Sequence, residues 1–142
     1  MKRLLLTIFL LLAATGSARS GVAIIANDSV PLDSISKDAL LDLYTGDVRK
    51  WKDGHRVVVM DLKERGELRE HFYAYLGKSS SRMKSIWLRK MLAGEADPPT
   101  TLDTEEEMLE TVRRTSGAIG FVDSSRVLDS VKVLAIIEDD SR

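Results

Sequence analysis

Residues 116–122, Ser-Gly-Ala-Ile-Gly-Phe-Val, contain a continuous apolar run bounded and interrupted by glycines. A short run without polar alternation is typical of a strand that is covered on both faces. Gly117 and Gly120 suit places where two backbones approach closely. The stretch therefore predicts a buried strand over 119–122, in a sheet with other layers packed against it.

Working outward from this strand, similar apolar runs predict further strands over 22–26, 57–60 and 131–137. Helices are predicted between the strands. Their expected N-terminal signals are Ser36, Glu67, the serines at 79–81, and Thr104 with Glu107 as a capping box, and glycines 46, 77 and 94 end the first three. The third helix is expected to turn Met83, Ile86, Trp87 and Met91 inward. Strands that alternate with helices indicate an α/β fold, a small mixed or mostly parallel sheet flanked by helices.

The chain begins with a pattern that predicts export. Lys2 and Arg3 precede an apolar run over 4–14, and small residues follow at 16–18. The run is shorter than the roughly 20 residues that a membrane-spanning helix needs, which argues against an anchor. We expect a signal peptide over 1–18, with cleavage after Ser20 as an alternative, and a single domain over 19–142. The processed chain is expected to be periplasmic or secreted and not membrane-spanning.

Composition restricts the partners. Removing Lys2 and Arg3 from the 21 basic residues leaves 19 against 22 acidic residues, a net charge of −3, so we expect no nucleic-acid partner. The chain has no cysteine, which excludes disulfides and thiolate metal sites.

No catalytic constellation can be assembled from the sequence. His55 and His71 are isolated, and the zinc-protease, nucleophile-elbow and phosphate-loop motifs are absent. A carboxylate pair such as Asp53 with Asp61 has no spacing that singles it out. We expect no enzyme activity, no cofactor and no metal.

The junction before the second helix is the strongest candidate for a ligand site. Arg65, Gly66, Glu67, Leu68 and Arg69 surround the expected helix start, with Lys63 just before them. Free amides, a glycine and flanking cations make an anion site in principle. The alternative is an ordinary strand-to-helix turn with exposed charges.

Three stretches occur in the order found in a known family. Residues 42–54, DLYTGDVRKWKDG, resemble the "IF-x-G-x-x-x-x-W-x-D-G" stretch of periplasmic phosphate-binding proteins, the substrate-binding subunits of phosphate ABC transporters. Residues 70–77, EHFYAYLG, are similar to a helix of that family, and residues 116–122, SGAIGFV, to its "pGAIGYV". The resemblance extends over about residues 22–135.

This resemblance implies one lobe of a type 2 periplasmic binding protein, a phosphate or similar anion as a weakly bound ligand, and an ABC permease as partner. In the family, an Arg and a Ser-Gly-Thr turn hold the phosphate at the start of the corresponding helix. This chain has Gly66, Glu67 and Leu68 there, so both hydroxyls are missing and a carboxylate is added. Arg65 matches the family Arg only with a shift in spacing.

Family members have two lobes and more than twice this length, so a partner would have to supply the second lobe that closes over the ligand. The resemblance therefore leaves an alternative function open. In it, the lobe is an envelope protein-interaction module that has lost phosphate binding and uses its emptied cleft or the basic helix face. That face comprises Arg82, Lys84, Arg89 and Lys90.

Overall fold

The computed structural model describes residues 21–63 and 66–138. The expected signal peptide over 1–18 and Arg65 lie outside these ranges. Within them, no helix is both long enough and apolar enough to cross a membrane.

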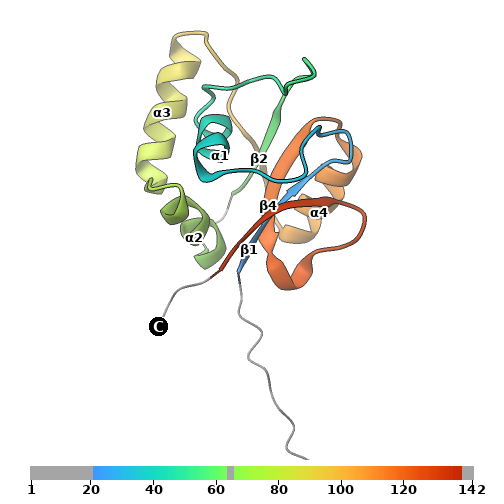
Figure 1. Ribbon diagram of the computed structural model, residues 1–142. Coiled ribbons are helices and arrows are strands. Elements are labelled where there is room, and N and C mark those ends of the chain that lie inside the picture. The colour runs from blue at the N-terminus through green and yellow to red at the C-terminus, as the bar shows by residue number, and fades with distance from the viewer. Residues whose placement is uncertain (1–20, 64–65, 139–142) are drawn as a thin grey trace, which may run out of the picture.

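The described residues alternate strands and helices, as expected for the α/β class (Figure 1). In chain order the elements are β1 (Val22–Ala26), α1 (Lys37–Tyr44), β2 (Val58–Leu62), α2 (Glu67–Tyr75), α3 (Ser80–Leu92), β3 (Thr100–Leu102), α4 (Glu105–Arg114), β4 (Ala118–Asp123), the short 3₁₀-helix η1 (Ser124–Arg126) and β5 (Lys132–Ile137).

The strands form one mixed sheet in the order β3-β2-β4-β1-β5. β2 runs parallel to β3 and β4, whereas β1 runs antiparallel to β4 and β5. All five residues of β1 are buried, because strands flank it on both sides and helices pack on the sheet. This arrangement confirms the mixed sheet that the sequence predicts.

Helices cover both faces of β4. Phe121 stacks on Phe72 of α2, with ring centroids 4.2 Å apart and planes at 16°. At the neighbouring position, a Cβ added to Gly120 would lie 2.5 Å from the Sδ of Met108 in α4. Successive strand residues point to opposite faces, so α2 and α4 lie on opposite faces of the sheet, as Figure 1 also shows. Gly120 is the position that lets α4 approach.

The long loop between α1 and β2 is tied to the sheet by Trp51. Its indole Nε1 donates a hydrogen bond of 3.0 Å to the carbonyl oxygen of Gly117, and the side chain is buried. The loop begins at Gly46, which has φ of 74° and ends α1 in the left-handed conformation that the sequence predicts.

Three local expectations were wrong. β2 begins and ends later than 57–60, and residues 100–102 form an unpredicted strand, which pairs Thr100 with Met60. Met91 is 45% exposed and does not point inward. Lys90 occupies the inward position in its place, because its ammonium group binds the carboxylate of Asp47.

Candidate functional site

The candidate site begins with an uncapped helix. The hydroxyl groups of Ser36, Ser79 and Thr104 accept hydrogen bonds from the first turns of α1, α3 and α4. At α2 the N-cap is Gly66, with φ of −136°, and no side chain of residues 21–63 or 66–138 caps the helix. A Cβ added to Gly66 would meet no atom of the described residues within 4 Å, so there is room for a side chain at this position. Four α-helices are described, and α2 is the one whose amide end is available to an acceptor from outside.

This end of α2 opens into a hollow of about 470 Å³. One wall consists of Leu62 and of residues 66–69, which are four of the five residues that the sequence selects. The fifth, Arg65, lies outside the described residues. The opposite wall comes from the start of α4 and from η1, and consists of Asp103, Thr104, Glu105, Glu106 and Arg126.

The start of α4 faces the same hollow and carries a side-chain cap. Thr104 Oγ1 accepts a hydrogen bond of 3.1 Å from the Glu107 amide. The Glu107 carboxylate accepts one of 3.0 Å from the amide of Asp103. The predicted capping box therefore has its threonine half, while its glutamate half reaches one residue further back than expected. Of the two helix starts that the structure describes at this hollow, the one at α2 has no side-chain cap and is the better candidate for binding an anion.

The side chain of Arg69 is engaged inside the fold. Its Nε and Nη2 each lie 3.2 Å from an oxygen of the buried Asp61 carboxylate at the end of β2. Its Nη1 donates to the Ser80 hydroxyl at 3.3 Å, and the guanidinium lies 4.6 Å from the centre of the Tyr73 ring. Arg69 thus joins β2, α2 and the start of α3, and its side chain is 19% exposed.

Tyr73 completes this buried network. Its hydroxyl donates to the Asp61 carboxylate, and burial together with the nearby negative charge raises the pKa of Tyr73 far above its ordinary value. The phenol therefore remains protonated and keeps donating. Sequence reasoning missed this network, although Arg69 and Tyr73 are four residues apart on a helix and Asp61 is the one charged residue of an otherwise apolar strand.

Carboxylates outnumber cations around the hollow. Among the residues that the structure describes, its charged lining consists of Glu67, Asp103, Glu105 and Glu106 against Arg69 and Arg126, a net charge of −2. Some are paired: Asp103 lies 3.9 Å from Lys63, and Glu105 lies 3.3 Å from Arg126. The sequence points to Glu67 as unfavourable for an anion. The sequence did not reveal that carboxylates of α4 also line the hollow, because acidic residues in a first helical turn are already explained by the helix dipole.

The structure assembles no catalytic group from the other candidates. His55 is 74% exposed and pairs with Asp53 at 2.9 Å, while Asp61 has Arg69 and Tyr73 as partners. The two aspartates considered as a pair therefore have different partners. Across residues 21–63 and 66–138, no group of three histidine, aspartate or glutamate side chains is placed to hold a metal.

No family model matches the sequence, and no curated protein matches it. Solved structures do match the fold. An ABC-type phosphate transport receptor from Vibrio cholerae aligns with a TM-score of 0.66 at 20% identity, covering 81% of this chain and 45% of that one. A protein from Clostridium perfringens, solved with bound phosphate and described as a phosphate ABC transporter substrate-binding protein, aligns with a TM-score of 0.68 at 21% identity, covering 81% and 44%.

PstS from Borrelia burgdorferi is a third similar structure, with a TM-score of 0.54 at 14% identity over 82% of this chain and 47% of that one. In each case the chain spans less than half the length of the protein it matches. At these identities the likeness concerns the fold. The chain therefore has the fold of one lobe of the substrate-binding proteins of phosphate ABC transporters.

Proposed function

We propose that the chain is an exported, single-lobe domain that binds phosphate or a related small anion weakly at the amino-terminal end of α2, in the service of an ABC transport system. The observation that carries this proposal is the uncapped start of α2 at Gly66, which opens into a hollow. Amides at a helix start, together with the positive end of the helix dipole, form a favourable anion site.

The charges around the hollow argue for weak binding. Glu67 and Glu106 line it without an ion pair to any described residue, and like charges raise the free energy of an incoming anion. Arg69 contributes little direct contact, since Asp61 already occupies its guanidinium. A second wall, from a permease or another envelope protein, would strengthen the grip by excluding water. The solved Clostridium perfringens protein holds bound phosphate, which supports testing phosphate first.

The experiment is a titration of the ¹⁵N-labelled chain with inorganic phosphate, followed through the backbone amides of Glu67 and Leu68. We expect saturable shifts of these amides at millimolar phosphate. Gly66→Asp supplies a carboxylate cap to the same amides, and its Cβ meets open space, so the variant should fold and lose the response. Wild-type amides that stay unchanged at millimolar phosphate would remove the proposal.

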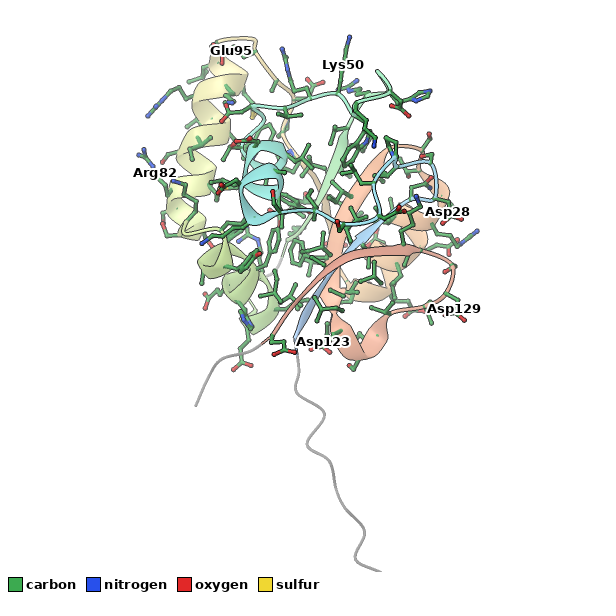
Figure 2. The ribbon with its side chains drawn as sticks, viewed as in Figure 1. Asp28, Lys50, Arg82, Glu95, Asp123 and Asp129 are labelled. Carbon is green, nitrogen blue, oxygen red and sulfur yellow. The ribbon has the colours of Figure 1, made fainter. Side chains whose placement is uncertain are left out.

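The alternative, an envelope protein-interaction module, has one observation in its favour. Leu88 and Leu92 of α3 are 52% and 81% exposed. The same helix carries Arg82 and Arg89, which are exposed and pair with no described carboxylate. Figure 2 shows Arg82 projecting from α3 away from the sheet. Binding to an envelope extract that is lost on reversing both arginine charges, while phosphate leaves the Glu67 and Leu68 amides unchanged, would favour this alternative.

A further inference from the structure

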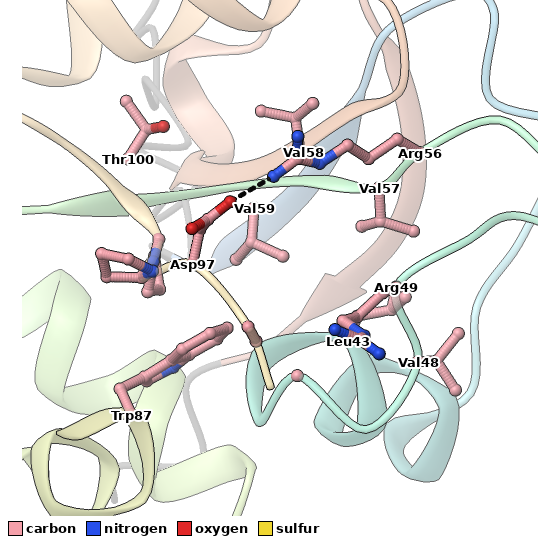
Figure 3. A pocket seen from close by; sticks show the side chains of 14 residues that line it. Leu43, Val48, Arg49, Arg56, Val57, Val58, Val59, Trp87, Asp97 and Thr100 are labelled. Carbon is pink, nitrogen blue, oxygen red and sulfur yellow. Dashed lines mark hydrogen bonds and ion pairs between the residues drawn. The ribbon is translucent and has the colours of Figure 1, made fainter. Parts of the chain in front are cut away.

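A second hollow, of about 320 Å³, lies at the start of β2, whereas the uncapped end of α2 follows the end of that strand. The two sites are therefore separated by the length of the strand. The hollow has apolar walls, formed by Leu43, Val57, Val59, Trp87, Pro98 and Pro99 (Figure 3). Its volume is at the lower end of the range of about 300–1,000 Å³ that is typical of small-molecule sites.

The hollow exists because β3 stops short. β2 pairs with β3 only from Met60, which lies opposite Thr100. The two residues before Thr100 are Pro98 and Pro99, which have no amide hydrogen and cannot extend the ladder. The connection therefore leaves the edge of β2. Val59 pairs with Ile119 of β4 on one side but has no partner in β3 on the other, and it remains half-buried.

The other walls are held in fixed positions. Trp87 Nε1 donates a hydrogen bond of 2.8 Å to the carbonyl oxygen of Tyr44, which sets the plane of the indole. Gly46 has φ of 74°, and a Cβ there would lie 3.0 Å from Trp87 Cη2. The Val57 amide donates to the carbonyl oxygen of Arg49 at 2.9 Å, which fixes the loop beside the strand. A ligand would therefore enter a preformed site.

Charged groups lie at the mouth. Arg56 Nη2 binds Asp97 Oδ2 at 2.6 Å, and Figure 3 shows this pair beside Val59. Arg49 also lines the hollow and pairs with no described carboxylate. The lining therefore carries one excess positive charge, from Arg49 and Arg56 against Asp97.

We propose that this hollow binds a small organic carboxylate, whose apolar body packs between Trp87 and Val59 and whose carboxylate pairs with Arg49. An apolar body suits the walls, and a single negative charge matches the excess positive charge at the mouth. Inorganic phosphate has no apolar part to bury, so this site differs in ligand class from the one at α2.

The test uses 4-phenylbutyrate, with 4-phenylbutan-1-ol as its uncharged match. The chain has two tryptophans, and only Trp87 lines the hollow. The NMR signal of the Trp87 indole N–H therefore reports on the site, and that of Trp51 serves as an internal control. We expect a saturable shift of the Trp87 indole signal, little change at Trp51, and binding of the alcohol weaker by about two- to fivefold. Equal binding of acid and alcohol, or a response confined to Trp51, would overturn the proposal.

Variants make the test specific. Arg49→Gln should weaken 4-phenylbutyrate binding by about fivefold, whereas Arg89→Gln on the outer face of α3 should leave it unchanged. Ala96→Leu fills the hollow and should abolish binding. Inorganic phosphate should not compete with 4-phenylbutyrate, because the two ligands are assigned to different sites. If 4-phenylbutyrate does not bind, the proposal of a phosphate site at α2 is unaffected. An Arg49→Gln protein that binds as tightly as the wild type contradicts the assignment.

Discussion

The Nε1 of Trp51 donates to the carbonyl oxygen of Gly117 at 3.0 Å, and this bond joins a loop residue to the residue just before β4. Gly117 has φ of 75°, and a Cβ there would lie 2.3 Å from the carbonyl oxygen of Arg56. The glycine is therefore required both by its conformation and by the close approach of the backbone just before β2.

Gly117→Ala should destabilise the fold by about 3 kcal/mol, because left-handed strain and a backbone clash act together. Gly54→Ala is the matched control, since Gly54 has φ of 88° but no atom within 4 Å of the added Cβ. Gly54→Ala should lose about 1–2 kcal/mol of unfolding free energy, from the backbone strain alone. Urea unfolding measures both; equal losses in the two variants would mean that the Arg56 carbonyl moves aside freely.

The buried Asp61 carboxylate should depend strongly on Arg69. Arg69→Gln leaves that charge without its bidentate partner, and we expect a loss of about 3 kcal/mol in unfolding free energy. Tyr73→Phe removes one hydrogen bond to the same carboxylate and should cost about 1–2 kcal/mol. If Asp61→Asn combined with Arg69→Gln is no more stable than Arg69→Gln alone, the uncompensated charge is not the cause.

Alkaline pH should destabilise the protein through its buried phenols. Burial first, and the Asp61 charge second, raise the pKa of both Tyr44 and Tyr73 above the ordinary value of 10.0. The stabilisation is complete below pH 10, where folded and unfolded phenols are both protonated. It is lost as the pH rises, because the unfolded chain releases protons first.

Each substitution, Tyr44→Phe or Tyr73→Phe, should therefore make the fall in unfolding free energy above pH 10 shallower by up to about 1.4 kcal/mol per pH unit. Urea titrations between pH 9 and 11 give the slopes. Lysines titrate in the same range, but they contribute equally to the wild type and the variants. Parallel slopes for all three proteins would show that neither phenol is linked to stability.

Gly120 and Met108 should be energetically coupled. A methyl group at Gly120 would lie 2.5 Å from Met108 Sδ and 3.1 Å from Val112 Cγ2, so Gly120→Ala forces α4 away from β4. We expect a loss of about 1–3 kcal/mol. In Met108→Ala the nearest atom is gone and only the contact with Val112 remains, so the added methyl should cost clearly less there. A double-mutant cycle by urea unfolding tests this, and additive losses would contradict the direct contact.

The sequence predicts most of the fold because its signals are local. Apolar runs without alternation locate β1 and β4, and Ser36 and Gly46 bound α1. β3 was missed, since three residues that follow two prolines are too few to show a periodicity, and the strand is defined by its pairing with Met60–Leu62 of β2. The ligand site itself stays a prediction; the structure adds the groups that surround its described residues. The meeting of Asp61 with Arg69, and of Glu67 with the start of α4, depends on tertiary packing that spacing along the chain does not encode.

The carboxylates around the α2 hollow should set its affinity for phosphate. Glu67 lies in the first turn of α2, and Glu106 lines the opposite wall, so each opposes an anion at the amides between them. Glu67→Gln and Glu106→Gln should each tighten phosphate binding by about two- to fivefold, the usual range for exposed charges. Glu95→Gln is the control, because Glu95 lies far from the hollow. The amide of Asp123 binds Glu105, which lines the hollow, and Figure 2 shows Glu95 at the opposite end of the molecule from Asp123. The gains should shrink as sodium chloride is raised, because salt screens exposed charges, and gains that are independent of salt would indicate a rearranged site instead.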